Sequence, residues 1–287
     1  MSFSHDVKKE LAKHLSSARH CQIAELAAIL HFCGQVGAGA KDEYYLGIQS
    51  ENEFVLQKCF TLLKKTVNID VGVFLDREDI QRITQLFGRF DEPVSGLLLK
   101  SSCCQRAFLR GAFLCVGSIS DPEKGYHLEF VCTEEHMAHQ LQEVMLCFGI
   151  EAKVILRKKY FVVYIKESES IVELLNVMEA PVALMNLENL RILKEVRNSI
   201  NRKVNCEAAN ITKTVNAASR QIEDIELLRD TLGLSNLPLA LRQMAEVRLN
   251  YPDASLKELG DYLDPPVGKS GVNHRLRKLS ELAEKYR

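Results

Sequence analysis

Tryptophan is absent from the 287 residues, and aromatic residues of all kinds make up only 7% of them. No apolar run approaches the roughly 20 residues that a membrane-spanning helix needs. The first six residues also lack the basic segment and apolar core of a secretory signal. Low-complexity tracts and long runs of like charge are missing too, which excludes a globally disordered chain. These absences predict a folded protein of the cytoplasm.

Disulfide and metal-binding signatures are equally scarce, although the chain has nine cysteines. Their number is odd, no two of them form a C-x-x-C pair, and most sit in apolar runs. We therefore expect reduced cysteines that pack as small buried side chains, with no metal site and no cofactor. The vicinal pair of Cys103 and Cys104 leaves redox activity open as an alternative. We expect His31 to be a core or surface residue rather than a metal ligand.

An excess of charge of one sign is absent from the chain as a whole, whose formal net charge is -1. The positive charges are nevertheless concentrated near the C-terminus. Residues 190–220 hold seven Lys or Arg against two acids, and residues 265–287 hold six against two. Because local patches matter more for DNA binding than the total charge, these two stretches are the candidates for a nucleic-acid contact.

What the sequence does contain is an internal repeat. Residues 26–34 (LAAILHFCG) align with residues 109–117 (LRGAFLCVG) at an offset of 83. The same offset places the amphipathic stretch 52–65 on 135–148. Each unit predicts a helix, a pair of strands, a second helix and a second pair of strands. The strand candidates are residues 44–49, 71–75, 126–132, 152–156 and 160–165.

Small residues are frequent in the repeated helix. They are Ala24, Ala27, Ala28 and Gly34 in the first copy and Gly111, Ala112 and Gly117 in the second. Glycine inside a helix costs about 1 kcal/mol relative to alanine, so its presence needs a compensating gain. Close contact between two helix backbones would provide that gain. We expect the two motif helices to pack on each other about a pseudo-twofold axis, with simple core positions as the alternative.

The duplicated region closes at residues 180–181, and residues 182–219 are predicted to form a basic linker helix and a connector. Residues 186–205 carry apolar residues at spacings of three and four and a basic second face. That face includes Arg202 and Lys203, which either contact DNA or form a solvated surface. The polar residues 205–216 are an ordered connector or a DNA-contacting arm, and the pattern leaves both open.

Three or four further helices are predicted over residues 220–287. Ser255 and Glu258 form a capping-box pattern at the start of one of them. A turn at residues 264–268 then separates it from a last helix that begins near residue 270. One stripe of this last helix is apolar and consists of Val272, Leu276, Leu279 and Ala283.

The opposite face of the last helix is rich in hydrogen-bond donors. It consists of Ser270, Asn273, His274 and Arg277, flanked by Lys269, Arg275 and Lys278. A buried stripe combined with a donor-bearing face near the N-terminal half is typical of a recognition helix in the major groove of DNA. Arginine can pair with guanine and asparagine with adenine, while Lys269 and Lys278 would contact phosphate. A surface helix with solvated charges is the alternative.

The ordered set of these features resembles known families. The repeated motif resembles that of the LAGLIDADG homing endonucleases, and the whole chain is similar to the bacterial WhiA family of DNA-binding regulators. The residues that carry the resemblance are 26–34, 109–113, 117–122, 186–189, 201–207 and 268–276. It implies an α+β fold in which a degenerate, pseudo-twofold LAGLIDADG-like domain of αββαββ topology precedes an all-α helix-turn-helix domain. The domains would span residues 1–181, with repeats at about 20–98 and 103–180, and residues 220–287.

The resemblance to nucleases also indicates what is missing. In LAGLIDADG nucleases, each motif helix supplies an acidic residue just before its final glycine, and the two carboxylates bind Mg²⁺. The corresponding residues here are Cys33 and Val116, and neither offers the hard oxygen ligand that Mg²⁺ requires. We therefore predict no catalytic residue and no nuclease activity. A residual Mg²⁺-dependent endonuclease would have to act through Asp42 or Asp121.

The sequence thus predicts a non-enzymatic, sequence-specific regulator of transcription that binds double-stranded DNA. Resemblance to the WhiA family implies links to sporulation, cell division and chromosome segregation, and a nucleoid-associated location. The N-terminal domain would contact DNA, a protein partner or both. Its basic hairpin tip of Arg157, Lys158 and Lys159 is either a phosphate contact or a solvated turn. The alternative function is that of a nucleoid or division protein that acts mainly through protein partners.

Overall fold

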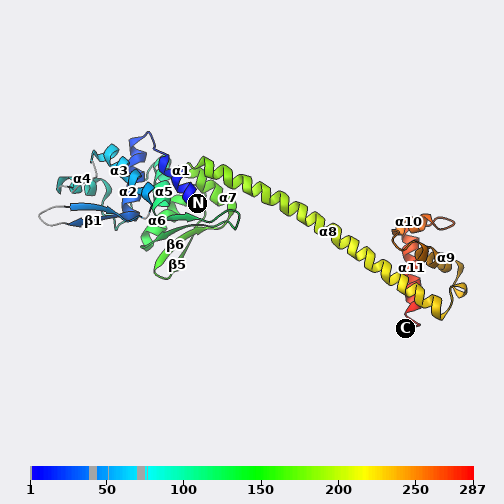
Figure 1. Cartoon of the computed structure of the whole chain (residues 1–287). Helices are drawn as coiled ribbons and strands as arrows, with labels where there is room; N and C mark the ends of the chain where they lie inside the picture. Colours follow the sequence, from blue (N-terminus) through cyan, green and yellow to red (C-terminus); the bar gives the residue numbers. More distant parts are fainter. Residues whose placement is uncertain (1, 39–43, 51, 70–74, 76) are drawn as a thin grey trace. The chain divides into compact units, whose positions relative to one another are not determined.

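The computed structural model describes residues 2–38, 44–50, 52–69, 75 and 77–287. The chain divides into two compact units, Met1–Lys194 and Glu195–Arg287, here called unit 1 and unit 2. Each unit has its own hydrophobic core. Unit 1 combines helices with antiparallel sheets and unit 2 is entirely helical (Figure 1). The predicted α+β fold class is confirmed.

Two buried helices form the centre of unit 1. They are α2 (Arg19–Cys33) and α5 (Ser102–Val116), the motif helices of the repeat, and they pack directly against each other. At Gly111, an added Cβ atom would lie 2.6 Å from the carbonyl oxygen of Glu25 and 2.9 Å from Cβ of Ala28. Only glycine permits this approach. The predicted close contact between the two helix backbones is therefore confirmed.

Each motif helix leads directly into a strand. In the first repeat, β1 (Gly34–Ala38) pairs antiparallel with β2 (Tyr44–Ile48). The second repeat forms a four-stranded antiparallel sheet in the order β3-β4-β6-β5. Its strands are β3 (Gly117–Ile119), β4 (Leu128–Cys132), β5 (Lys153–Arg157) and β6 (Tyr160–Ile165).

Four of the five strand candidates are confirmed to within two residues as β2, β4, β5 and β6. The fifth candidate covers residues 71–75, of which 71–74 lie outside the described residues, while Leu75 forms an antiparallel bridge with Tyr44. Strands β1 and β3 were not among the candidates. They are too glycine-rich or too short to show an alternating apolar pattern.

The remaining helices of unit 1 cover the motif pair and the sheets. The amphipathic stretches of the repeat form α3 (Glu53–Val67) and α6 (Glu135–Leu146), as predicted. Asn52 begins α3 as its N-cap, because its side chain accepts a hydrogen bond from the backbone N–H of Phe54 at 3.0 Å. Three more helices complete the unit: α1 (Phe3–Lys13), α4 (Arg77–Phe87) and α7 (Ser168–Val177).

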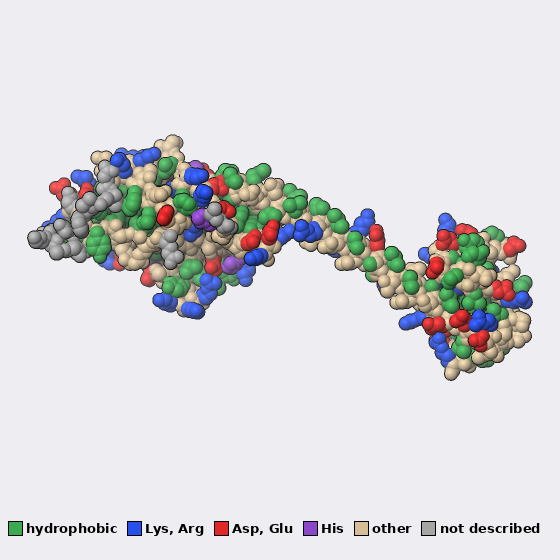
Figure 2. Space-filling model, in the orientation of Figure 1, with side chains coloured by type: hydrophobic (Ala, Val, Ile, Leu, Met, Phe, Trp, Pro, Cys, Tyr) green, Lys and Arg blue, Asp and Glu red, His purple; other side chains and the backbone are tan. Residues whose placement is uncertain are grey.

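The predicted linker helix and the polar stretch after it belong to a single helix, α8 (Pro181–Thr231). The carboxylate of Glu10 caps its first turn by accepting hydrogen bonds from the N–H groups of Val182 and Ala183, at 2.7 and 2.9 Å. Hydrophobic side chains recur along this helix (Figure 2). Charged and polar residues interrupt them, and none of the described helices is apolar enough over a sufficient length to cross a membrane.

Unit 2 packs the end of α8 against three shorter helices. These are α9 (Leu239–Asn250), α10 (Leu256–Asp261) and α11 (Lys269–Ala283). A short 3₁₀ turn, η1 (Leu234–Asn236), precedes α9. The predicted capping box begins α10: the Ser255 hydroxyl accepts from Glu258 N–H, and the Glu258 carboxylate accepts from Ser255 N–H.

Candidate nucleic-acid interface

The apolar stripe of α11 docks this helix in the core of unit 2. Val272, Leu276, Leu279 and Ala283 are each at most 1% exposed. They belong to the same hydrophobic cluster as Met244 of α9 and Leu259 of α10. Burying four apolar side chains fixes the orientation of α11 about its own axis, because any other orientation would expose them to solvent. The predicted docking stripe is confirmed.

A close backbone contact joins α10 to the turn before α11. The N–H of Val267 donates to the carbonyl oxygen of Gly260 at 3.0 Å. A Cβ atom added at Gly260 would lie only 2.0 Å from the carbonyl oxygen of Val267. Glycine is therefore required at this position, and the contact fixes how α11 leaves the turn.

The opposite face of α11 is exposed and positively charged. Six of the seven predicted contact residues are exposed there, and Arg275 is half-buried; the exposed six are Lys269, Ser270, Asn273, His274, Arg277 and Lys278. Their spacing of three and four residues places Ser270, Asn273 and Arg277 on one line along the helix. No acidic residue occurs between Lys269 and Ser280. This face can therefore donate hydrogen bonds to DNA bases and attract phosphate.

Arg277 is engaged in an ion pair within its own helix. Its Nε lies 3.0 Å from Oε1 of Glu281, and the two side chains are 79% and 57% exposed. Exposed ion pairs of this kind contribute little free energy, because solvent screens them. The guanidinium can therefore exchange Glu281 for a base at small cost.

The start of α11 offers a second kind of contact. Gly268 is the N-cap and has no side chain that could bond the first turn. The backbone N–H groups at a helix N-terminus attract anions such as phosphate. Lys269, the first residue of the helix, adds a full positive charge beside them.

Arg202 and Lys203 are exposed on α8, as predicted, but the structure does not bring them to α11. Arg202 lies 23 residues before Ile225, the residue at which α8 enters the core of unit 2. At the rise of an α-helix this separation is about 35 Å. The predicted DNA-contacting residues therefore form two groups, one on α11 and one far along α8.

Cys33 and Val116 occupy equivalent places, since each is the last residue of its motif helix. Hydrogen bonding from the Cys115 thiol, opposed by burial and aided by Lys8, lowers the pKa of Cys33. Neither position carries an oxygen ligand. Asp121 accepts a hydrogen bond from Glu123 N–H at 3.0 Å within a surface turn, and Asp42 lies outside the described residues.

His31 is a structural residue of the core. Its Nδ1 lies 2.7 Å from the carbonyl oxygen of Glu92, and its Nε2 lies 2.9 Å from that of Phe87. Both ring nitrogens therefore face backbone oxygens rather than a metal site. His31 therefore lies in the core, one of the two locations that the sequence left open for it.

The basic hairpin tip between β5 and β6 lies on the surface, where Lys and Arg side chains gather (Figure 2). Lys158 and Lys159 are exposed, and Lys158 has a left-handed backbone with φ of 58°. Arg157 is paired with Glu129 at 3.2 Å. The two lysines are thus the exposed cations of this tip that could meet phosphate, and Nζ of Lys159 also lies 5.4 Å from the centroid of the Tyr160 ring.

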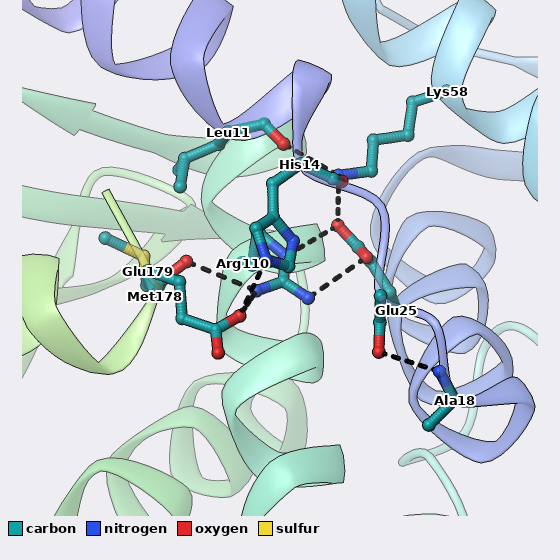
Figure 3. Close-up of polar contacts among 9 residues, drawn as sticks. Leu11, His14, Ala18, Glu25, Lys58, Arg110, Met178 and Glu179 are labelled. Carbon is teal, nitrogen blue, oxygen red and sulfur yellow. Dashed lines mark hydrogen bonds and ion pairs between the residues drawn. The ribbon is translucent and has the colours of Figure 1, made fainter. Parts of the chain in front are cut away.

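Sequence reasoning missed a buried ionic network between the motif helices (Figure 3). Glu25 of α2 is fully buried and accepts from Arg110 of α5 and Lys58 of α3. Arg110 also pairs with Glu179, which in turn lies 3.2 Å from Nε2 of His14. The repeat register gave no sign of this network, because Glu25, Lys58 and Arg110 do not occupy equivalent positions.

Comparison with known proteins decides the family. Three family models match the chain: the WhiA N-terminal LAGLIDADG-like domain over residues 19–87, the WhiA LAGLIDADG-like domain over 105–197, and the WhiA C-terminal HTH domain over 200–283. The chain is 48% identical to the probable cell division protein WhiA of Lachnoclostridium phytofermentans, with 100% of each chain covered. The chain belongs to the WhiA family. A WhiA relative from Desulforamulus reducens is 46% identical over 100% of this chain and 97% of its own.

A solved WhiA structure shares the fold. The crystal structure of full-length DUF199/WhiA from Thermatoga maritima matches with a TM-score of 0.62 and 26% identity, covering 100% of this chain and 99% of that one. The match to the family's helix-turn-helix includes α9, α10 and α11. Together with the cell-division naming of the relatives, this WhiA-type domain supports a role as a DNA-binding regulator.

Proposed function

We propose that the protein is a sequence-specific regulator of transcription that binds double-stranded DNA and has no nuclease activity. The observation that carries this proposal is the two-sided character of α11. One stripe is locked in the core of unit 2, and the opposite face exposes donors and cations, with no acid between Lys269 and Ser280. A helix held in this way can enter the major groove with its donor face toward the bases.

Within this proposal the residues of α11 have different roles. Ser270, Asn273, His274 and Arg277 contact base edges, since they occupy the exposed face of its N-terminal half. Lys269 and Lys278 contact phosphate, and half-buried Arg275 supports them from the flank. Arg202 and Lys203 would contact the DNA backbone at a distance from the base-reading site.

The proposal assigns the LAGLIDADG-like unit a non-catalytic role. Cys33 and Val116 stand where the nuclease acids would be, so the two Mg²⁺-binding oxygens of such enzymes are not provided there. The unit would contact DNA through its basic hairpin tip, hold a protein partner, or do both. Because the relatives are named as probable cell division proteins, we propose a role in cell division. The resemblance to the family adds sporulation and chromosome segregation as further processes, and the nucleoid as the location.

Selection of bound duplexes from a randomised DNA pool, with Mg²⁺ present, tests the proposal. Full-length strands that share a motif are the expected result. Shortened strands would overturn the non-enzymatic assignment and direct attention to Asp42 and Asp121. Strands that are bound but share no motif would favour a nucleoid or division protein that acts through partners.

A further inference from the structure

Four potential metal ligands meet at the start of the two motif helices. His20 and Cys21 lie in the first turn of α2, and Cys103 and Cys104 lie in the first turn of α5. The Nδ1 of His20 and the three Sγ atoms all lie within 4.8 Å of one another. Among the described residues, these side chains bring together one imidazole and three thiols, a donor set typical of structural zinc.

The internal repeat explains this meeting. The offset of 83 that aligns the two motif helices places His20 on Cys103 and Cys21 on Cys104. Because α2 and α5 pack on each other, equivalent residues at their N-terminal ends come face to face. Cys33 and Val116 occupy the opposite ends of the same helices. The cluster is therefore separate from the place of the lost nuclease site.

The distances between the ligand atoms of the cluster are close to those between the ligands of a coordinated zinc ion. From Nδ1 of His20, the Sγ atoms of Cys104, Cys21 and Cys103 lie at 3.2, 3.4 and 3.9 Å. In a tetrahedral site with Zn–S bonds of about 2.3 Å and Zn–N bonds of about 2.0 Å, ligand atoms are separated by about 3.5–3.8 Å. Side-chain adjustments of about 1 Å or less would complete the tetrahedron.

The burial of the four residues suits a structural site that an ion can reach. Cys21 and Cys104 are buried, at 5% exposure each, whereas His20 and Cys103 are exposed. The two buried thiols fix the position of the cluster, and the two exposed ligands leave an entry path. The first turns of two helices also favour the negative charge of bound thiolates.

We propose that His20, Cys21, Cys103 and Cys104 bind one zinc ion, which joins the first turns of the two motif helices. The sequence prediction of no metal site relied on the odd number of cysteines, the absence of C-x-x-C spacing and the apolar runs around most of them. The ligands instead come as two adjacent pairs from the two halves of the repeat. The ion would act as a cross-link between these halves. The four protein ligands would occupy all four coordination positions and leave none open for catalysis.

Protons must leave the thiols when the ion binds. Because zinc binds the thiolate form of cysteine, its binding displaces the protons of the three thiols. The affinity for zinc is accordingly expected to fall as the pH is lowered.

Titration of the tag-free full-length chain with Co²⁺ alone, after reduction and removal of metal by a chelator, tests the site. One equivalent should bind and give thiolate charge-transfer absorption together with the visible bands of tetrahedral Co²⁺. Added Zn²⁺ should bleach this spectrum at one equivalent. Zinc should also raise the melting temperature of the chain relative to the chelated protein.

The variants Cys103→Ser and His20→Ala test the ligands without disturbing the core, because both side chains are exposed. Each should weaken Co²⁺ binding by more than about 100-fold, since loss of a direct ligand exceeds the effect of losing a supporting residue. Cys147→Ser and Cys206→Ser are matched controls, because these cysteines are exposed and lie outside the cluster. Both controls should bind Co²⁺ like the unaltered chain, and circular dichroism should show that all four variants fold.

Three results would overturn the proposal. One is the absence of a tetrahedral Co²⁺ spectrum from the reduced, folded chain. Another is an unchanged affinity in Cys103→Ser and His20→Ala. The third is a disulfide among Cys21, Cys103 and Cys104 in metal-free protein isolated without reductant, shown by mass spectrometry, which would assign these thiols to redox chemistry instead.

Discussion

Arg110 of α5 and Glu25 of α2 form an ion pair inside the contact between the two motif helices. The Nε of Arg110 lies 3.0 Å from Oε1 of Glu25, and their side chains are 1% and 0% exposed. The same Oε1 lies 2.6 Å from Nζ of Lys58. Glu179 supplies a second carboxylate to Arg110. Two anions and two cations therefore balance; Glu25, Lys58 and Arg110 are shielded from solvent, whereas Glu179 is 45% exposed (Figure 3).

Replacing Arg110 by methionine should destabilise unit 1 by about 3–5 kcal/mol, because it removes one partner of a buried ion pair and leaves Glu25 undercompensated. Urea unfolding followed by circular dichroism measures this loss. Arg89→Ala is the control, since Arg89 and its partner Asp91 are both well exposed. The control should leave the unfolding midpoint nearly unchanged, and equal effects of the two substitutions would contradict the role given to Arg110.

Gly111→Ala should destabilise the contact between α2 and α5. Alanine would stabilise an unhindered helix position by about 1 kcal/mol. At Gly111, however, the new Cβ meets the backbone oxygen of Glu25 at 2.6 Å, and overpacking of this kind should give a net loss of about 1–2 kcal/mol. Gly96→Ala is the control, because none of the described atoms lies within 4 Å of its added Cβ. A Gly111→Ala variant as stable as the unaltered protein would contradict the close approach.

Unit 1 should lose stability as the pH falls below about 6.5. Burial, then the nearby charge of Arg110, lowers the pKa of His14, against the opposing influence of Glu179 and Glu25. The unfolded chain therefore binds a proton at a pH where the folded His14 is still neutral, and this difference favours unfolding as the pH drops through that window. The Nδ1 of His14 is also buried without a hydrogen-bond partner among the described residues.

Melting temperatures of the unaltered chain and of His14→Gln, measured across this pH range, check the effect. The variant should show a shallower decline on acidification. His139→Gln serves as the control, since the His139 side chain is 53% exposed. An unchanged decline in His14→Gln would assign the acid sensitivity to other groups.

Ser255→Ala should destabilise unit 2 by about 1 kcal/mol, because it removes the side chain that accepts a hydrogen bond at the start of α10. Thermal unfolding of the two variants Ser255→Ala and Lys257→Ala compares the cap with an exposed residue of the same helix. Lys257→Ala should have little effect. Equal stability of both variants would mean that tertiary packing alone holds α10.

Substitutions on α11 should separate base readout from phosphate contact. Asn273→Ala should cost about 1–3 kcal/mol of binding free energy and relax the preference at one base pair of the selected site. Lys278→Ala should weaken binding evenly across sequences and reduce the dependence of log affinity on log salt by about 1. Binding measured at several salt concentrations on the selected duplex and its single-base variants checks both. Uniform losses from both substitutions would contradict direct readout by α11.

Most helices were predictable because their signals are local. The apolar spacing of Val272, Leu276 and Leu279 predicts both the helix and the face that it buries, and Ser255 with Glu258 predicts where α10 begins. The repeat at an offset of 83 predicted the paired motif helices and, through Gly111, their close contact. These features depend on residues within one or two helical turns, or on a register that the sequence itself displays.

Other features depend on context that local patterns lack. The polar residues 205–216 resemble a connector in composition, yet they lie within α8, because extending a helix that is already formed on both sides avoids the cost of nucleation. Strand β1 has few large side chains and becomes a strand by pairing with β2. Arg202 and Lys203 look like part of one basic surface with α11 in the sequence, whereas the length of α8 separates them.

The sequence by itself determined the duplicated architecture, the helix-turn-helix and the docking stripe of its last helix, because periodicity, capping residues and repeat register are written along the chain. Only the tertiary structure decided which distant side chains meet. Packing of α2 on α5 buries Glu25 with Arg110 and Lys58, and it brings His20 and Cys21 to Cys103 and Cys104. Such contacts join residues more than 30 positions apart, and their energies depend on burial and distance, which exist only once the helices have packed.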